Sequence, residues 1–256
     1  MSGVVMLAGK DPVSNIVYHA LARSFPIDAV IREAKLPVLT FLRRRVKNLG
    51  PGRVLGQLLF VGGVLPVVNF RSSRRLQQII SSNRLDTSEI PHSCVIEVAS
   101  VNSDVTISEL QRLSPSVVIV NGTRIIQEKV LQCVDAVFLN THAGITPMYR
   151  GVHGGYWALA SRDFDNCGVT VHKVDRGIDT GSIVAQVSIT PTAEDTFATY
   201  PLLQTAGAIP LLEQAVRDAL AGSLSVVPPR CSGKSQLWTH PTAWQYLKNR
   251  IRLGVR

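Results

Sequence analysis

Three polar residues in the second half of the chain have the types and order needed for chemistry on a carbonyl group. Asn140 and His142 stand in the stretch Asn-Thr-His, and Asp179 follows later in Gly-Ile-Asp-Thr-Gly. An amide N–H can hold an oxyanion, an imidazole can move a proton near neutral pH, and a carboxylate can fix the tautomer of that imidazole. The set therefore indicates transfer of an acyl group to an amine.

The elements around these residues should place them at one edge of a sheet. The apolar run Ala136–Leu139 ends at Asn140, and Val169–Val174 leads toward Asp179. Open α/β sheets bind ligands where strands end and loops begin. Asn140 taken alone favours an ordinary turn residue, because Asn hydrogen-bonds its own backbone there. The ordered set with His142 and Asp179 favours catalysis.

At these residues the sequence resembles the folate-dependent formyltransferases, a family that includes glycinamide ribonucleotide transformylase, methionyl-tRNA formyltransferase and the nucleotide-sugar N-formyltransferases. The Asn-x-His, the Pro147 and Gly151 after it, and the Asp179 motif carry the resemblance. It implies that Asn140, His142 and Asp179 are catalytic. It also implies that 10-formyltetrahydrofolate is the formyl donor.

The same resemblance implies where the folate binds. The pterin would lie along the segment that follows the apolar run Val117–Val120 and in the loop that ends at Asp179, held largely by backbone groups. Asp175 is equally suited to an ordinary surface pair with Arg176. The expected folate-binding residues are Gly122, Thr123, Arg124, Ile125, Asp175 and Ile178.

The residues expected to hold the amine substrate are spread along the chain. A helix that starts at Ser14-Asn15 could bind a phosphate, and Arg150-Gly151 resembles the sugar and tRNA branches. His153 could reach a phosphate or simply cap the next helix. The expected substrate-binding residues are Lys10, Ser14, Asn15, Arg150, Gly151, His153 and His172, the last resembling a second histidine of the purine branch. No metal is expected, since the spacing of these histidines matches no common ligand motif.

Apolar runs alternate with helical patterns, which predicts a Rossmann-like α/β fold with a mostly parallel sheet and helices on both faces. Helices are expected from Ser14, from Thr106 or Ser108 to Leu113, over Leu211–Leu220, and from Pro241 or Thr242 onward. The expected strands are Val4–Ala8, Asp28–Ile31, Cys94–Val98, Val117–Val120, Ala136–Leu139, Val169–Val174 and Ile183–Ile189.

The size of the chain, 256 residues of which 45% are hydrophobic, suits one core with a modest appendage. We expect a formyltransferase domain over residues 1–222, interrupted by a helical basic insertion at about 36–85. A C-terminal tail with a terminal helix, residues 223–256, should follow.

Positive charge is concentrated in two segments that contain no acidic residue. Ten basic residues lie between Ala34 and Leu85 and six lie after Asp218, so 11 of the 27 basic residues and all 18 acidic residues lie elsewhere. The chain carries a net charge of +9. The natural partners of such segments are anionic: the folate glutamate tail, a nucleotide diphosphate, an RNA or a membrane surface.

The first basic segment also contains an uncharged, apolar run from Val54 to Phe70. A transmembrane helix needs about 20 apolar residues, and this run is shorter and interrupted by Gly62-Gly63 and Pro66. Peripheral contact with a membrane is an open alternative. We favour a helical insertion packed against the sheet, with its arginines in solvent.

The N-terminal sequence lacks the pattern of a signal peptide, and the four cysteines indicate reduced thiols, so a cytoplasmic protein is expected. A homodimer formed through the tail is left open.

The leading interpretation is a nucleotide-sugar N-formyltransferase that acts on an amino-dideoxy sugar for surface polysaccharide (O-antigen) synthesis, with GDP-perosamine as a guess at the substrate. No nucleic-acid partner is expected, because the barrel domain of methionyl-tRNA formyltransferases has no counterpart in the short segment after Gly222. The alternatives are glycinamide ribonucleotide transformylase, a hydrolase that releases formate from the folate, and a non-catalytic relative that binds an anionic ligand or a membrane through the insertion.

Overall fold

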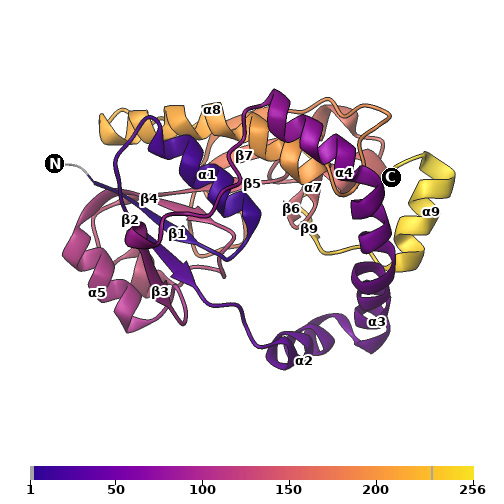
Figure 1. The fold of residues 1–256 in the computed structure, drawn as a ribbon, viewed down its shortest axis with the longest axis horizontal. Helices are drawn as coiled ribbons and strands as arrows, with labels where there is room; N and C mark the ends of the chain where they lie inside the picture. Colours follow the sequence, from indigo (N-terminus) through magenta and orange to yellow (C-terminus); the bar gives the residue numbers. More distant parts are fainter. Residues whose placement is uncertain (1–2, 232) are drawn as a thin grey trace.

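A seven-stranded sheet forms the centre of the computed structural model, which describes residues 3–231 and 233–256. The strand order is β3-β2-β1-β4-β5-β7-β8. Pairs among the first five of these are parallel, whereas β7 pairs with β5 and with β8 in antiparallel fashion. Figure 1 shows helices on both sides of the sheet, which confirms the expected Rossmann-like fold. The strands are β1 (Gly3–Ala8), β2 (Ile27–Glu33), β3 (Val95–Val98), β4 (Pro115–Asn121), β5 (Val137–His142), β7 (Gly168–Lys173) and β8 (Ile183–Ser188).

The central strands bury both faces, because successive side chains of a strand point to opposite sides of the sheet. Val4 and Met6 of β1 pack with α1 (Pro12–Ala22) and α8 (Tyr200–Leu220). Val5 and Leu7 pack with α5 (Asp104–Leu113) and α6 (Glu128–Leu131) on the other face. Continuous apolar runs are the consequence of this double coverage.

Three helices begin earlier than the sequence predicted, and one of them, α8, starts at Tyr200 rather than near Leu211. Asp11, not Ser14, caps α1: its carboxylate accepts from the backbone N–H groups of Val13 and Ser14. Pro12 follows at the first helical position, where its fixed φ is favourable. Ser103, one residue before Asp104, caps α5 by accepting from the Thr106 N–H.

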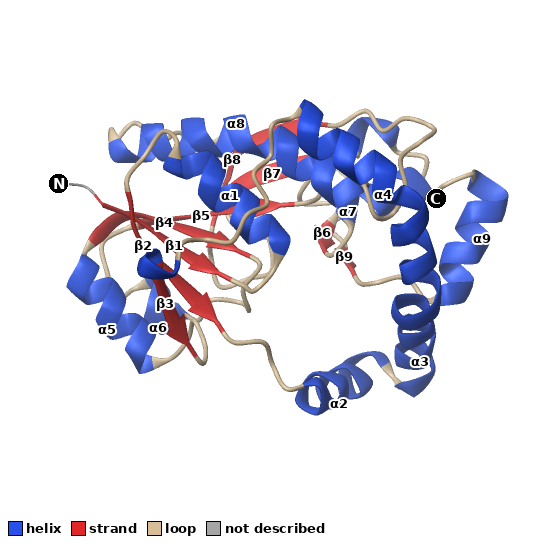
Figure 2. Ribbon diagram, viewed as in Figure 1, coloured by secondary structure: helices blue, strands red, loops and turns tan. Residues whose placement is uncertain are grey.

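The basic insertion consists of α2 (Val38–Leu49), α3 (Pro51–Leu59), a π-helical turn (Phe60–Val64) and α4 (Leu65–Ser82), which we call the helical arm. The expected interruption at Gly62-Gly63 and Pro66 was wrong. The π turn holds both glycines, and Pro66 falls in the first turn of α4, so the helix continues from Pro51 to Ser82. By length and composition alone this helix could cross a membrane. Figure 2 shows α2 and α3 projecting away from the sheet.

A second, aromatic core joins the arm to the rest of the chain. It lies where the arm meets α7 (Gly154–Ala160), the start of α8 and α9 (Ala243–Leu253). Phe60 contacts Phe197 and Tyr246 edge-on or tilted. A short parallel pair, β6 (Arg150–Gly151) with β9 (Leu237–Trp238), fastens the C-terminal segment beside the site. Thr242 caps α9 with a capping box, so this helix starts close to the predicted Pro241 or Thr242.

Candidate active site

Asn140 and His142 both lie at the carboxyl end of β5, where the parallel part of the sheet ends. Asp179 lies in the loop between β7 and β8, with a left-handed φ of 52°. An Asp tolerates this conformation better than most residues. The Gly151 N–H donates to Asp179 Oδ2 over 3.0 Å. The strand ends thus bring the three predicted catalytic residues together.

His172 lies directly opposite Asn140 in the antiparallel pair of β5 with β7. Its Nδ1 is 2.7 Å from the Lys173 carbonyl oxygen, which can only accept, so Nδ1 carries the proton. Its Nε2 is 3.1 Å from Asn140 Nδ2 and 3.7 Å from Asp179 Oδ1. We expected His172 to bind substrate, but it contacts two of the predicted catalytic residues.

His142 lies behind Asp179 and is only 5% exposed. Its Nδ1 is 3.2 Å from Asp179 Oδ2, and its Nε2 is 2.6 Å from the Tyr149 carbonyl oxygen. Both ring nitrogens therefore face acceptors, and only the imidazolium can donate to both. Burial lowers the pKa of His142 below its ordinary value, against the opposing attraction of the Asp179 carboxylate.

The carboxylate of Asp179 links the two histidines. Burial would raise its pKa, but the neighbouring imidazoles of His172 and His142 and the Gly151 N–H together lower the pKa of Asp179 below the usual aspartate value. Asp179 therefore stays ionised in a largely buried position. An ionised carboxylate here favours a proton on either imidazole.

A cavity of about 370 Å³, which we call the site cavity, opens beside this cluster. Asn140, His172 and Asp179 line it, whereas His142 does not. Its walls come from the segment after β4 and from the loop after β7. All six residues expected to bind folate are among the lining residues: Gly122, Thr123, Arg124, Ile125, Asp175 and Ile178.

Local contacts and one glycine shape these walls. The Asp175 carboxylate accepts from the Gly177 N–H and the Thr180 hydroxyl, so it folds the loop rather than pairing with Arg176. Arg176 pairs with Glu128 instead. Gly122 has a φ of 66°, and a Cβ there would collide with Asp11.

A second cavity of about 670 Å³, which we call the neighbouring cavity, shares a wall with the first. Gly122, Thr123 and Arg124 line both. Lys10 also lines the neighbouring cavity, where its ammonium group lies 3.3 Å from Glu97. Arm residues Val38 and Phe41 close another side of it.

Gly151 lines the site cavity, as His172 does, whereas the remaining expected substrate residues lie elsewhere. Ser14 is buried and donates to the Asn121 carboxamide oxygen over 3.0 Å, and Asn15 lies one position farther into α1. The Arg150 guanidinium donates to the Ile178 carbonyl, and its buried Nε has no partner among the described residues. Arg150 therefore supports the Asp179 loop from the side away from the site cavity.

His153 precedes α7 in the capping position, with a φ of 59°, but its side chain makes no cap hydrogen bond. Its Nε2 lies 3.1 Å from His240 Nδ1, and its ring packs on Phe197. Burial lowers the pKa of His153 to about 3 and that of His240 to about 4. Both imidazoles are therefore neutral near pH 7.

Sequence reasoning missed two residues of the neighbouring cavity, His240 and Glu33. His240 lines this cavity although it follows the site motifs by a long stretch of chain. Glu33, at the end of β2, accepts from the Arg124 N–H and pairs with its guanidinium, which fixes the shared wall. A polar residue at the end of an apolar strand, as at Glu33, was the only available signal.

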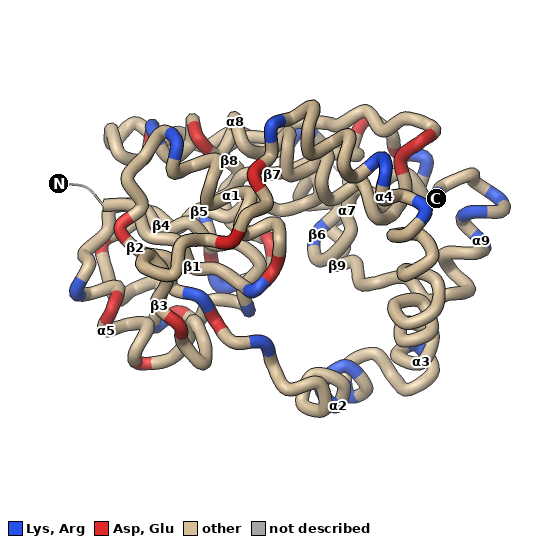
Figure 3. The backbone as a smooth tube through the Cα atoms, viewed as in Figure 1, with Lys and Arg blue, Asp and Glu red and all other residues tan. Residues whose placement is uncertain are grey.

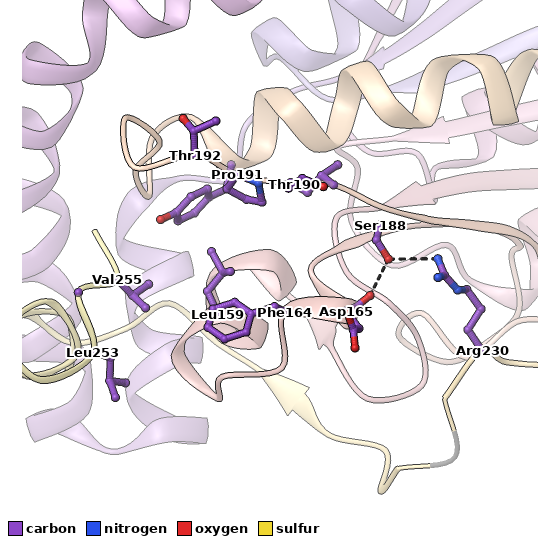
Figure 4. Close-up of a pocket in the computed structure, with 13 residues that line it drawn as sticks. Leu159, Phe164, Asp165, Ser188, Thr190, Pro191, Thr192, Arg230, Leu253 and Val255 are labelled. Carbon is purple, nitrogen blue, oxygen red and sulfur yellow. Dashed lines mark hydrogen bonds between the residues drawn. The ribbon is translucent and has the colours of Figure 1, made fainter.

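Another cavity lies away from these residues, between Leu159, Phe164, Pro191 and the C-terminal segment (Figure 4). Arg230 donates to the Ser188 hydroxyl, which donates to the Asp165 carbonyl. No predicted site residue lines this cavity. Within residues 3–231 and 233–256, no group of three or more His, Cys, Asp or Glu side chains has a metal-binding arrangement.

Sequence comparison identifies relatives of the chain. Methionyl-tRNA formyltransferase of Desulfotalea psychrophila is 31% identical over 121 residues, which cover 46% of this chain and 37% of that protein. The chain matches less than half the length of this and similar curated relatives.

Solved structures share the fold. A phosphoribosylglycinamide formyltransferase of Streptococcus pneumoniae superimposes with a TM-score of 0.56 at 18% identity, over 86% of this chain and 99% of that one. The N-formyltransferase of Helicobacter canadensis, solved with folinic acid and dTDP-3-aminofucose, gives a TM-score of 0.54 at 14% identity, over 93% and 71% of the two chains.

The formyl transferase family model matches residues 73–202. This segment is half of the chain, and it includes every residue of the Asn140, His142, His172 and Asp179 cluster. The chain therefore belongs to the formyltransferase family.

Proposed function

We propose that the chain transfers a formyl group from 10-formyltetrahydrofolate to the amine of a nucleotide-linked amino-dideoxy sugar. The observation that carries this proposal is the position of Asn140, His172 and Asp179 on one cavity that shares its wall with a second, larger one. Donor and acceptor would occupy the two cavities and meet at the cluster.

The chemistry of the site cavity suits a folate. Its lining combines apolar side chains such as Ile125 and Ile126 with the backbone of two loops, which can exchange hydrogen bonds with a pterin ring. The folate would supply the carbon that is transferred. Gly122, Thr123, Arg124, Ile125, Asp175 and Ile178 would hold it there.

The cluster can handle the two demands of the reaction. Asn140 Nδ2 would donate to the formyl oxygen as that oxygen gains negative charge. His172 Nε2, unprotonated in the free site, would accept the proton that the attacking amine loses, with Asp179 stabilising the resulting imidazolium. The same nitrogen can return the proton to the departing folate nitrogen. No covalent bond to the protein is needed.

His142, which the family resemblance implied to be catalytic, would not touch the reacting groups directly. Its ring nitrogens are engaged by Asp179 and the Tyr149 carbonyl, away from the site cavity. In this arrangement His142 positions the carboxylate of Asp179. His142 would therefore contribute to catalysis through the Asp179 carboxylate.

The neighbouring cavity would hold the nucleotide sugar. Lys10, Arg124 and Lys35 line it and supply the positive charge that a diphosphate requires. A sugar N-formyltransferase with the same fold was solved with dTDP-3-aminofucose bound. We propose GDP-perosamine as the specific substrate. The product would then serve O-antigen synthesis.

A coupled assay tests the function. Purified protein with 10-formyltetrahydrofolate is given dTDP-, UDP- and GDP-linked amino sugars, glycinamide ribonucleotide, or no amine, and release of tetrahydrofolate is followed. We expect turnover that depends on one nucleotide sugar. Turnover only with glycinamide ribonucleotide would assign the purine reaction, amine-independent release would indicate a hydrolase, and no turnover with any amine would contradict the proposal.

A further inference from the structure

The apolar side of α2 is only partly covered in the structure. Val38, Leu39, Leu42, Val46 and Leu49 recur at helical spacing and share one side of this helix. None of the residues of α2 is buried, and Val38 and Leu39 are each 70% exposed. The sequence predicted that such residues would pack against the sheet. Instead, the arm carries its own apolar surface into solvent.

The long helix of the arm exposes further apolar side chains. One side of that helix packs on the core through Val54, Phe60, Val68 and Ile79. Other positions on it expose large apolar side chains, of which Phe70 is 82% exposed. The exposed apolar residues of the long helix are Leu55, Leu58, Leu59, Val61, Val67 and Phe70. Large exposed apolar side chains gathered on one segment in this way are typical of an interaction site.

Positive charge surrounds these apolar residues. Arg43, Arg44 and Lys47 lie on α2 and are exposed, as are Arg53 and Arg71 farther along. No acidic residue occurs between Ala34 and Leu85. Figure 3 shows Lys and Arg along α2, α4 and the adjacent α9. An amphipathic helix with basic and apolar sides is the pattern that lies in the headgroup region of an anionic bilayer.

We propose that the helical arm, Val38–Ser82, is a docking surface for an anionic lipid bilayer, on which the protein lies peripherally. The positive charge of the arm, together with its exposed apolar residues, favours a bilayer over the other possible partners. A second copy of the chain that used the same surface would set two acid-free basic surfaces against each other. An RNA would neutralise the arginines but leave exposed residues such as Leu39 and Phe70 uncovered. A bilayer with anionic headgroups matches both features.

The contacts of the arm with the core define the docking as peripheral. Arg75 forms a two-point ion pair with the buried Asp195, and Ser72 hydrogen-bonds Thr196. At the other end of the helix, Gln57 donates to the His240 carbonyl. A helix that crossed the bilayer would lose these contacts. The arm can therefore remain on the core and still present its outer side to lipid.

Flotation with vesicles tests the proposal directly. The purified protein is mixed with vesicles of phosphatidylcholine alone or of phosphatidylcholine with phosphatidylglycerol, and the protein that rises with the lipid is measured. We expect most of the protein to float with the anionic vesicles and several-fold less with the neutral ones. Raising the salt from about 0.1 M to about 1 M shortens the screening length from about 10 Å to about 3 Å and should weaken binding.

Two variants and a matched control assign the effect to the arm. R43S/R44S/K47S removes three exposed charges from α2, and L39S/F70S removes two exposed apolar side chains. Each should lower flotation at least several-fold. R112S/K129S/R217S removes three exposed charges from outside the arm and should float like the wild type. Thermal unfolding of each variant shows whether it is folded.

Several results would overturn the proposal. One is a wild type that does not float with anionic vesicles, and another is a control variant that loses as much binding as R43S/R44S/K47S. Light scattering that finds a dimer abolished by L39S/F70S, without vesicle binding, would assign the surface to a second copy. Salt-sensitive RNA binding without vesicle binding would assign it to nucleic acid. None of these measurements depends on formyl transfer.

Discussion

The carboxamide of Asn140 meets the imidazole of His172 across the antiparallel pair of β5 with β7, with Nδ2 and Nε2 3.1 Å apart. The Lys173 carbonyl fixes the tautomer of His172, so the nitrogen that faces Asn140 and the site cavity is the basic one. An oxyanion donor and a proton acceptor are thereby adjacent, which formyl transfer to an amine requires.

Replacing either histidine of the cluster should slow turnover. We expect His172→Ala and His142→Ala each to lower kcat by about two powers of ten, because one removes the proton acceptor and the other the partner of Asp179. Steady-state kinetics of the formyl transfer measures both. His92→Ala, at an exposed histidine outside the site, should keep full activity. Near-full activity in His142→Ala would remove that residue from the mechanism.

Asp179→Asn separates the charge of this residue from its backbone conformation. Asn tolerates the left-handed φ of 52° as Asp does, so the loop should keep its shape, whereas Ala at this position would add strain. We expect turnover to fall by about two powers of ten with an unchanged melting temperature. Unchanged turnover would show that the carboxylate charge has no part in the proton relay.

The His153–His240 pair should make the protein sensitive to acid. In the unfolded chain both histidines titrate near pH 6.5, whereas burial lowers the folded pKa values to about 3 and about 4. Below pH 6.5 the unfolded state therefore binds protons that the folded state does not, and stability falls with falling pH. Each histidine should cost about 2 kcal/mol between pH 6.5 and pH 5.

Denaturant unfolding at pH 7.5 and at pH 5 measures this loss. His240→Gln cannot be protonated and should lose less stability over the interval than the wild type. Equal losses in the two proteins would mean that other groups cause the acid sensitivity.

Arg75→Ala should loosen the arm from the core. Asp195 is fully buried, and its carboxylate accepts from both Nε and Nη2 of Arg75. Removing the guanidinium leaves a buried carboxylate without its counter-ion, which costs about 3 kcal/mol. The pair R75M/D195N, which removes both charges and keeps a side-chain oxygen that can accept from the Thr192 N–H, should recover part of the loss. Chemical denaturation of the two variants and the wild type provides the comparison.

The elements of the fold could be predicted from the sequence because buried parallel strands are nearly continuous apolar runs. Val117–Val120 and Ala136–Leu139 are such runs, and both form central strands. The cap of α1 was misplaced because Asp11, Ser14 and Asn15 are all good capping residues. Only the actual path of the chain between Gly9 and Pro12 selects Asp11.

The candidate site could be predicted in part for a related reason. Asn140, His142 and Asp179 sit where apolar runs end, so their convergence follows from the sheet. The contact between Asn140 and His172 depends on the register of an antiparallel pair, which no local pattern encodes. His240 reaches the neighbouring cavity only because β9 pairs with β6. Contacts of this kind join segments that lie far apart in the sequence, so no local pattern predicts them.

The wall of Gly122, Thr123 and Arg124 that divides the two cavities also limits the order of events. This segment, held by the hydrogen bond from the Arg124 N–H to Glu33, would touch both ligands at the same moment. Donor and acceptor would then form a ternary complex before any bond changes. Initial-rate plots at several donor concentrations should therefore intersect, whereas the parallel lines of a ping-pong enzyme would require a formylated protein.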